Sequence, residues 1–330
     1  MVRNRFASLL AAYPIVWSIL SIVTVAAPHR GGPLALSQIF APHLLLPVLL
    51  LVPIAVSSKS RALHVGLLVA LVIGAARVGP GLVSIPSSPP TSDASVVRIL
   101  SWNLEGSATP AVDLLAQLRD SDADIVALQE LTHEHAAAIR ADAELTARFP
   151  GPALVPRGDA GGLGVLSRFA IAEAIDDRDP PFQVVALRLP DGRLSIINAH
   201  PFAPRFPVGE STPFPLAFDP AQRDADILHI RAAIEHELVA ERPLIVLGDF
   251  NVTDREPGFD DLSRGLWDAH QEVGQGTGST WRPQELEFMP FGVLRIDYFL
   301  GGPATRPLSV FGDCSPSSDH CILTGTAAVE

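Results

Sequence analysis

The chain has 330 residues, 48% of them hydrophobic, and a mean hydropathy of +0.29, which excludes a disordered or collagen-like chain and is too apolar for an ordinary soluble enzyme. Residues 1–96 carry six Lys/Arg and one acid, a net charge of +5, whereas residues 97–330 carry 18 Arg, no Lys and 35 acids, a net charge of −17. This division predicts a membrane part followed by an acidic globular part. The negative charge of the globular part repels nucleic-acid backbones, but it still permits a phosphate ligand whose charge metal ions neutralise.

Three long apolar runs lie near the N-terminus, and they predict three transmembrane helices within residues 1–78. The runs are Phe6–Ala27, which has no charge, Ile39–Val56 and Ala62–Ala76. The last run is short for a bilayer, but it extends to Arg77, whose long side chain can reach the interface. Two further runs after the first argue against a cleaved signal peptide. The alternative is two spans followed by a peripheral third helix.

Basic residues near the ends of these runs predict their orientation. Arg3 and Arg5 precede the first run, Lys59 and Arg61 separate the second from the third, and the loop between the first two runs has a single arginine. Because basic residues stay on the cytoplasmic side, the N-terminus is expected in the cytoplasm. Three crossings then place the remaining chain outside the membrane. Residues 79–96 are rich in Pro, Ser and Gly, which predicts a semi-stiff linker.

Residues 97–330 alternate short apolar runs with amphipathic stretches, which predicts one α/β domain. The expected strands are Val97–Trp102, Ile125–Gln129, Gly164–Leu166, Gln183–Leu189, Leu194–Asn198, Leu244–Leu247, Arg295–Leu300 and Cys321–Ala327. The expected helices are Ala111–Asp120, His133–Ala147, Pro220–Glu241 and roughly Pro257–Leu266. Asp191 followed by Gly192 predicts a hairpin turn.

Polar side chains lie at the ends of several of these strands, where α/β sheets commonly build sites. The residues that follow strands are Asn103, Glu130, His200, Asp249 and Asn251, while Asp319 and His320 precede the last strand. Asp297 lies inside the apolar run VLRIDYFL. An acid leaving an apolar strand costs desolvation energy unless it is paired or binds a metal. One such acid could simply cap a helix, but six strand ends argue against coincidence. The oxygen-rich set suits Mg²⁺ or Mn²⁺ better than zinc. Since there is no Walker loop and no GxSxG motif, we expect metal-assisted attack of water on a phosphoester.

The ordered motifs SWNLEG, IVALQE, NAHP, LGDFN, RIDYF and SSDHC span residues 98–324. Together they resemble the endonuclease/exonuclease/phosphatase superfamily, which has the DNase I-like fold. The resemblance implies an α/β four-layer sandwich of two mixed β-sheets flanked by helices. It also implies a Mg²⁺-dependent phosphodiesterase or phosphatase.

The same resemblance implies roles for five residues in the motifs. Glu130 would be the main metal ligand, and Asn103 and Asp319 would complete or support the metal shell. Asp249 would orient or deprotonate the attacking water. Asn251 would hold a phosphate oxygen.

The resemblance also implies roles for two histidines, Asp297 and Trp281, and one arginine is a candidate from its place in the sequence. His320 would stabilise charge on the phosphoryl oxygens, with Asp297 fixing its tautomer. His200 would protonate the leaving oxygen or bind the phosphate, although it could be a satisfied strand-end histidine. Trp281 is expected near the substrate, or else in the core. Arg223 could face a phosphate, or else be a solvated or salt-bridged helix residue.

Three spans followed by this domain resemble a membrane-bound bacterial subgroup of the superfamily, whose actinobacterial members are associated with teicoplanin resistance and thought to act on lipid-linked envelope phosphates. The expected partners are therefore a phosphorylated, lipid-linked or small envelope substrate and the membrane itself. One alternative is an extracytoplasmic nuclease acting on DNA or RNA, which the acidic charge disfavours. Another is an inactive binding module anchored at the surface. The sequence leaves the oligomeric state open.

Two further features stay undecided at the level of sequence. The Phe- and Pro-rich segment Phe202–Asp219 could be an apolar lid beside the site or a loop whose Phe side chains enter the core. Cys314 and Cys321 are too few for a disulfide scaffold or a thiolate zinc site. Outside the cytoplasm they could pair and pin the loop that carries Asp319, although the superfamily often has a lone cysteine there.

Overall fold

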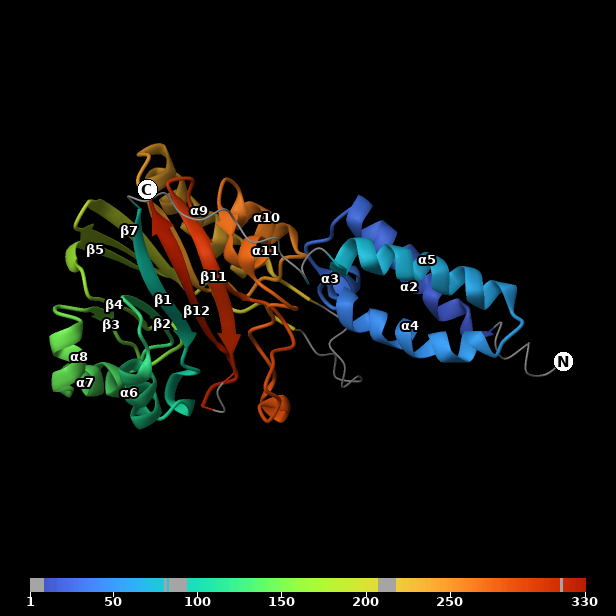
Figure 1. Ribbon diagram of the computed structural model, residues 1–330, viewed down its shortest axis with the longest axis horizontal. Coiled ribbons are helices and arrows are strands. Elements are labelled where there is room, and N and C mark those ends of the chain that lie inside the picture. The colour runs from blue at the N-terminus through green and yellow to red at the C-terminus, as the bar shows by residue number, and fades with distance from the viewer. Residues whose placement is uncertain (1–8, 80–81, 83–93, 207–217, 315–316) are drawn as a thin grey trace. The chain divides into compact units, whose positions relative to one another are not determined.

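The computed structural model describes residues 9–79, 82, 94–206, 218–314 and 317–330. The chain divides into two units, one of helices near the N-terminus and one that contains most of the remaining residues. The second unit is built on two mixed six-stranded sheets (Figure 1). The predicted α/β sandwich of two mixed sheets flanked by helices is therefore confirmed.

The first sheet has the strand order β11-β12-β1-β2-β4-β3. Its strands are β1 (Ser95–Asn103), β2 (Ile125–Gln129), β3 (Ala153–Val155), β4 (Leu163–Ser167), β11 (Thr305–Asp313) and β12 (Ile322–Val329). β1 and β2 run parallel, with Asn103 beside Gln129, and the other pairs are antiparallel. Because β1 and β2 run in the same direction, Asn103 and Glu130 emerge at the same edge of the sheet.

The second sheet has the order β5-β6-β7-β8-β10-β9. Its strands are β5 (Ala170–Arg178), β6 (Pro181–Leu189), β7 (Gly192–Ala199), β8 (Leu244–Asp249), β9 (Trp267–Asp268) and β10 (Asp297–Gly301). β7 and β8 are parallel, so His200 and Asp249 leave them at one edge. β10 is antiparallel to β8 and pairs Asp297 with Asp249. Asp297 therefore begins its strand instead of lying inside it, and reaches the same edge from the opposite direction.

Alternating side chains bury both faces of the first sheet. Val97 and Ile99 point into the core between the sheets, whereas Leu100 and Trp102 pack on the outer face. This period of two is the strand pattern that the sequence indicates. The outer face is covered by α6 (Ala111–Asp120), α7 (His133–Ala141) and α8 (Ala143–Arg148), which Figure 1 shows grouped together. α9 (Ala221–Val239) and α10 (Pro257–Ser263) pack on the outer face of the second sheet.

The N-terminal unit contains α2 (Ala12–Ala26), α3 (Gly32–Ile39), α4 (Ala41–Val56) and α5 (Arg61–Val78). The Tyr13 hydroxyl donates to the Leu44 carbonyl, and the Trp17 indole donates to the Ala41 carbonyl, which ties α2 to α4. α5 is long and apolar enough to cross a bilayer. α3 and α4 together meet the same criterion if the pair, bent by 64°, counts as one span, and α2 is apolar but shorter.

Helix α2 buries its small polar residues and exposes aliphatic ones. α2 buries Ser18, Ser21 and Thr24 among its neighbours, while Ile19 and Ile22 on the same helix are each 55% exposed. At the end of α5, Arg77 donates to the Ser21 carbonyl and the Thr24 hydroxyl of α2 at 3.1 and 3.0 Å. Small polar residues inside and aliphatic residues outside are typical of helices that pack in lipid.

Several local expectations need correction. The expected helix His133–Ala147 is two helices, because Asp142 ends α7 and its carboxylate caps α8 by accepting from the Glu144 and Leu145 amides. The expected loop before the second apolar run contains α3, and Pro42 lies in the first turn of α4. Before α9, the Asp219 side chain accepts from the Ala221 amide at 3.1 Å.

Two expected segments lie largely outside the described residues. Most of the linker expected at residues 79–96 does, and so do residues 207–217 of the expected Phe- and Pro-rich lid. Of the lid's aromatic residues, Phe206 is half exposed and packs against the buried Phe218, with ring centroids 5.4 Å apart. The lid and the core-loop interpretations therefore both stay predictions.

Candidate active site

Side chains from both sheets meet at the edge where β1, β2, β7 and β8 end. The Asn103 amide nitrogen donates to Asp249 Oδ2 at 3.0 Å and to Glu130 Oε1 at 3.3 Å. Asn103 is fully buried and Asp249 is 1% exposed. One amide thus connects a carboxylate of the second sheet to a carboxylate of the first. Its carbonyl oxygen is turned back and accepts from the Glu105 amide at 2.9 Å, which fixes the orientation of the side chain.

His200 faces the same two carboxylates. Its Nε2 lies 3.4 Å from Asp249 Oδ2 and 3.8 Å from Glu130 Oε1. Its Nδ1 lies 2.8 Å from the Ala160 carbonyl oxygen and must donate to it, since a carbonyl only accepts. Burial disfavours the charged ring, but Asp249 and Glu130 outweigh burial, so the pKa of His200 is raised.

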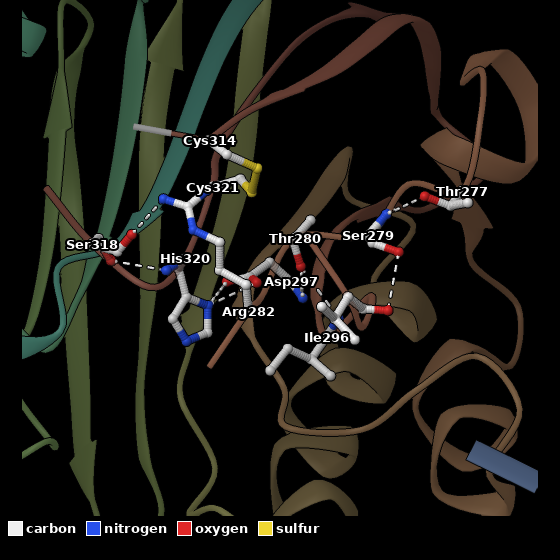
Figure 2. Close-up of a disulfide and its surroundings, with 11 residues drawn as sticks. Thr277, Ser279, Thr280, Arg282, Ile296, Asp297, Cys314, Ser318, His320 and Cys321 are labelled. Atoms are coloured by element: carbon white, nitrogen blue, oxygen red, sulfur yellow. Dashed lines mark hydrogen bonds and ion pairs between the residues drawn. A yellow bond between two sulfur atoms is a disulfide. The ribbon is translucent and has the colours of Figure 1, made fainter. Parts of the chain in front are cut away.

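His320 and Asp297 form a buried dyad, which Figure 2 shows, and His320 also faces Asp249. His320 Nδ1 donates to the two Asp297 carboxylate oxygens at 2.9 and 3.1 Å, and Nε2 lies 3.5 Å from Asp249 Oδ2. Burial opposes protonation of this ring, but the charges of Asp297 and Asp249 raise the pKa of His320 to about 10. Asp249 sits between two histidines, whose charges overcome its burial and lower its pKa.

Asp319 forms a second group of acids with Glu105. The Trp281 indole donates to Asp319 Oδ2 at 2.7 Å, and the Asp319 amide donates to Glu105 Oε2 at 3.0 Å. Burial and the nearby Glu105 charge raise the pKa of Asp319 to about 6 despite the attraction of His320. The Asp319 Oδ1 atom is buried and has no hydrogen-bond partner among the described residues, and it lies 3.8 Å from His320 Nε2.

Tight turns set the direction of Glu130 and Asn251. Both have the left-handed backbone conformation, with φ of 55° and 51°, which non-glycine residues rarely adopt outside constrained sites. The Asn251 amide donates to Asp249 Oδ1 at 2.9 Å, and its side chain donates to the Pro201 carbonyl at 3.1 Å. This turn connects Asn251 to the residue that follows His200.

Arg223 lies behind that turn. It is 1% exposed, donates to the Asn251 carbonyl at 2.9 Å and pairs with Asp224 at 2.7 Å. The structure therefore brings Arg223 to the backbone of Asn251 and not to the Asp249 carboxylate. The remaining predicted site residues converge. The Trp281 indole joins the acidic cluster through its hydrogen bond to Asp319. The Trp281 backbone pairs antiparallel with that of Leu294 and with that of His320.

The arrangement fits a divalent cation. Asp249, Asp297 and His320 have ligand atoms within 4.8 Å of one another, and the carboxylates of Glu130 and Asp319 lie beside this group. The buried Asp319 Oδ1 requires a donor or a cation to offset its desolvation. Carboxylate and amide oxygens are the ligands that Mg²⁺ and Mn²⁺ prefer.

A sequence model of the Endonuclease/Exonuclease/phosphatase family matches residues 100–320. The chain belongs to this family. It is accordingly a hydrolase of phosphoric ester bonds in a metal-dependent family, as its motifs indicated. No curated protein sequence matches the chain.

Solved structures share the family fold at low sequence identity. An endonuclease/exonuclease/phosphatase from Bacteroides vulgatus is 18% identical, with a TM-score of 0.56, covering 72% of this chain and 100% of that one. TDP2 from C. elegans is 17% identical, with a TM-score of 0.54 and coverage of 72% and 77%. The 3′ phosphatase NExo from Neisseria, bound to product DNA, is 19% identical, with a TM-score of 0.53 and coverage of 71% and 99%. These similarities establish that the chain has the DNase I-like fold.

The sequence did not single out three residues that support the site. Glu105 contacts the Asp319 amide and accepts from the Gln284 side chain at 2.9 Å. Ser318 donates to the Asn103 carbonyl and accepts from the His320 amide, and Thr280 accepts from the Asp297 amide. Glu105 could have been found, because it is an acid inside the SWNLEG motif that supplies Asn103.

Proposed function

We propose that this chain is a membrane-anchored phosphoesterase in which Glu130 and Asp319 hold a divalent cation, while Asn103 supports the metal shell by donating to Glu130 through its amide nitrogen. Such a cation neutralises phosphoryl oxygens and makes the phosphorus more susceptible to attack. The observation that carries the proposal is the convergence on Asp249, whose Oδ2 atom lies 3.0 Å from Asn103, 3.4 Å from His200 and 3.5 Å from His320. These residues come from both sheets, so the fold brings them together at one point.

The directions of the pKa shifts support separate roles for the three central residues. Asp249 has a lowered pKa, so it is a weak base suited to orienting an attacking water by accepting its hydrogen bond. His200 has a raised pKa and can donate a proton to the leaving oxygen. His320 is protonated at neutral pH, so it can stabilise the developing charge on the phosphoryl oxygens, with Asp297 holding its ring. Asn251 would bind a phosphate oxygen, and Trp281 would flank the substrate.

The N-terminal helices support the anchored part of the proposal. α5 has 18 residues and spans about 27 Å, close to the roughly 30 Å of a bilayer core. The buried Ser and Thr of α2, beside its exposed Ile residues, favour a lipid environment. Three crossings would place the catalytic domain outside the cytoplasm. The Cys314–Cys321 disulfide supports that side of the membrane, because disulfides persist in oxidising compartments.

The substrate class that fits this layout is a phosphomonoester, pyrophosphate or phosphodiester of a lipid-linked or small envelope compound. An anchored enzyme meets lipid substrates at the surface where they lie. A nuclease is the second candidate, because the related NExo is described as bound to DNA. The net charge of −17 over residues 97–330 argues against a grip on long nucleic acid.

A phosphate-release panel tests the proposal on the full chain in detergent. It includes isoprenoid pyrophosphate, phospholipids, nucleotides and plasmid DNA, each with Mg²⁺ and with EDTA. We expect Mg²⁺-dependent release from a lipid-linked phosphate and none from Glu130→Gln, while Asp177→Asn at an exposed Asp–His pair stays active. Salt-sensitive cleavage of plasmid DNA in preference to the lipids would instead favour the nuclease.

Accessibility to protease in intact cells tests the topology separately. We expect added protease to digest the catalytic domain from outside. Protection of the domain in intact cells, followed by digestion after lysis, would contradict the proposed orientation and leave the chemistry untouched.

A further inference from the structure

The structure contains a disulfide directly beside the catalytic dyad. Cys314 follows β11 and Cys321 precedes β12, and these strands pair antiparallel with Asp313 opposite Ile322. The disulfide therefore closes the connection between the two strands at their ends. His320 is the residue immediately before Cys321, so the closed loop carries part of the proposed site.

Other contacts hold the described part of the loop from Ser317 onward, and Figure 2 shows those made by Ser318 and His320. The Ser317 carbonyl accepts from the Thr109 hydroxyl, and the Asp319 amide donates to Glu105. The His320 amide donates to Ser318 Oγ at 3.0 Å, and the Ser318 carbonyl accepts from the Arg282 guanidinium at 3.2 Å. The Cys321 amide donates to the Thr280 carbonyl at 2.6 Å. On the β11 side, the covalent bond at Cys314 joins the loop to this buried end.

We propose that the Cys314–Cys321 disulfide is a positioning element that holds Asp319 and His320 in register with Asp249, so that its reduction reversibly lowers phosphoester hydrolysis. The inference rests on the roles proposed above for these residues. His320 Nε2 lies 3.5 Å from Asp249 Oδ2 and 3.8 Å from Asp319 Oδ1, so a displacement of about 1 Å removes this geometry and costs on the order of a hundredfold in rate.

A cavity gives a small reductant access to the bond. It has a volume of about 290 Å³ and is lined by Cys314 and Asp297, with the exposed Phe291 and Phe311 among its other lining residues. A dithiothreitol thiolate attacks Cys314 Sγ, and Cys321 Sγ leaves as a thiolate and takes up a proton. The second thiol of the reagent then displaces Cys314 as a thiol, which leaves a reduced dithiol in the protein and an oxidised reagent.

The test uses the full chain in detergent with Mg²⁺ and two probes, 4-nitrophenyl phosphate and bis(4-nitrophenyl) phosphate. The sequence has two cysteines, so the reductant has one disulfide to act on. On reduction, verified by alkylation of two thiols, we expect kcat/KM to fall about a hundredfold, mainly through kcat, and to recover on reoxidation. The matched control is Cys314→Ser with Cys321→Ser, which should have the low activity of the reduced enzyme and no response to dithiothreitol.

Hydrogen exchange gives a second measurement that does not depend on activity. We expect a peptide covering residues 317–323 to exchange more than tenfold faster after reduction, with the β8 peptide 244–249 unchanged. Full reduction with kcat/KM within threefold of the oxidised enzyme would overturn the proposal, as would equal acceleration at β8, which would mean general destabilisation. If the oxidised enzyme hydrolyses neither probe, the proposed function fails for these substrates, and the exchange comparison alone decides the positioning role.

Discussion

Replacement of Asp297 by Asn tests whether the charge behind His320 contributes to catalysis. The substitution keeps the shape of the side chain but removes the negative charge that accepts from His320 Nδ1 at 2.9 and 3.1 Å. The pKa of His320 is raised from 6.5 to about 10. A difference of this size corresponds to about 5 kcal/mol in favour of the protonated ring. The charge of Asp297 is the largest favourable contribution to the protonated His320 ring. We therefore expect its removal to reduce transition-state stabilisation by about 2 kcal/mol, which lowers kcat roughly 30-fold.

Loss of ring orientation adds to this figure, and removal of the orienting acid in a serine-protease triad costs about 10⁴. We therefore expect kcat to fall between roughly 30-fold and 10⁴-fold. The alkaline limb of the pH–rate profile should also move to lower pH, because the His320 ring loses the charge that keeps it protonated. The assay is Mg²⁺-dependent hydrolysis of 4-nitrophenyl phosphate between pH 6 and 10.

Asp177→Asn is the matched control, because Asp177 also faces a histidine, His229, at 3.4 Å on the exposed surface. Surface pairs contribute little, so this variant should retain wild-type kcat. An Asp297→Asn protein within threefold of wild type, with an unshifted alkaline limb, would refute the reasoning.

Three further changes probe the metal, the proton and the supporting turn. Glu130→Gln should weaken Mg²⁺ binding at least tenfold, as measured by calorimetry, because it replaces a charged oxygen ligand; unchanged affinity would contradict its role. The pKa of Asp319 is raised to about 6, and a ligand must lose its proton. Mg²⁺ affinity should therefore fall about tenfold per pH unit below pH 6. Calorimetry in buffers of different ionisation enthalpy should show that Mg²⁺ binding releases a proton, and the Asp319→Asn variant should release none. Arg223→Met should lower the free energy of unfolding by about 1–3 kcal/mol, because it removes the hydrogen bond to the Asn251 carbonyl and the ion pair with Asp224, while KM stays near wild type. A raised KM with unchanged stability would instead indicate that Arg223 contacts the substrate.

The strands that place the site were predictable because their apolar residues alternate or run without a break. Ile125 and Val126 face opposite sides of the first sheet, and each is covered, so β2 begins with a continuous apolar run. β5 and β11 were not expected. β5 lies at a sheet edge with mostly exposed or half-exposed residues, and β11 contains Pro307, which is tolerated at an edge strand but weakens the pattern.

The same omission explains why the cysteine pairing stayed open. Cys314 and Cys321 lie at paired strand ends only because β11 aligns Asp313 with Ile322. Without an expected β11, the sequence offers two cysteines seven positions apart and no register between them. Glu105 was missed for a related reason, since its contact with Asp319 joins positions 214 residues apart. Contacts between loops depend on the packing of both sheets, which a local pattern does not contain.

Because the site is strongly acidic, the predicted cation would be needed for binding the phosphate substrate as well as for catalysis. The site gathers the carboxylates of Glu105, Glu130, Asp249, Asp297 and Asp319 within a domain of net charge −17. Two histidines do not balance five acids even when both are protonated, so a phosphate ester approaching this edge meets a negative potential. A divalent cation lowers that potential where the phosphate must lie. The acidic domain is therefore compatible with phosphoesterase chemistry only if the substrate binds together with the metal. The same charge disfavours long polyanions, because their other phosphates would face acidic surface that no cation neutralises.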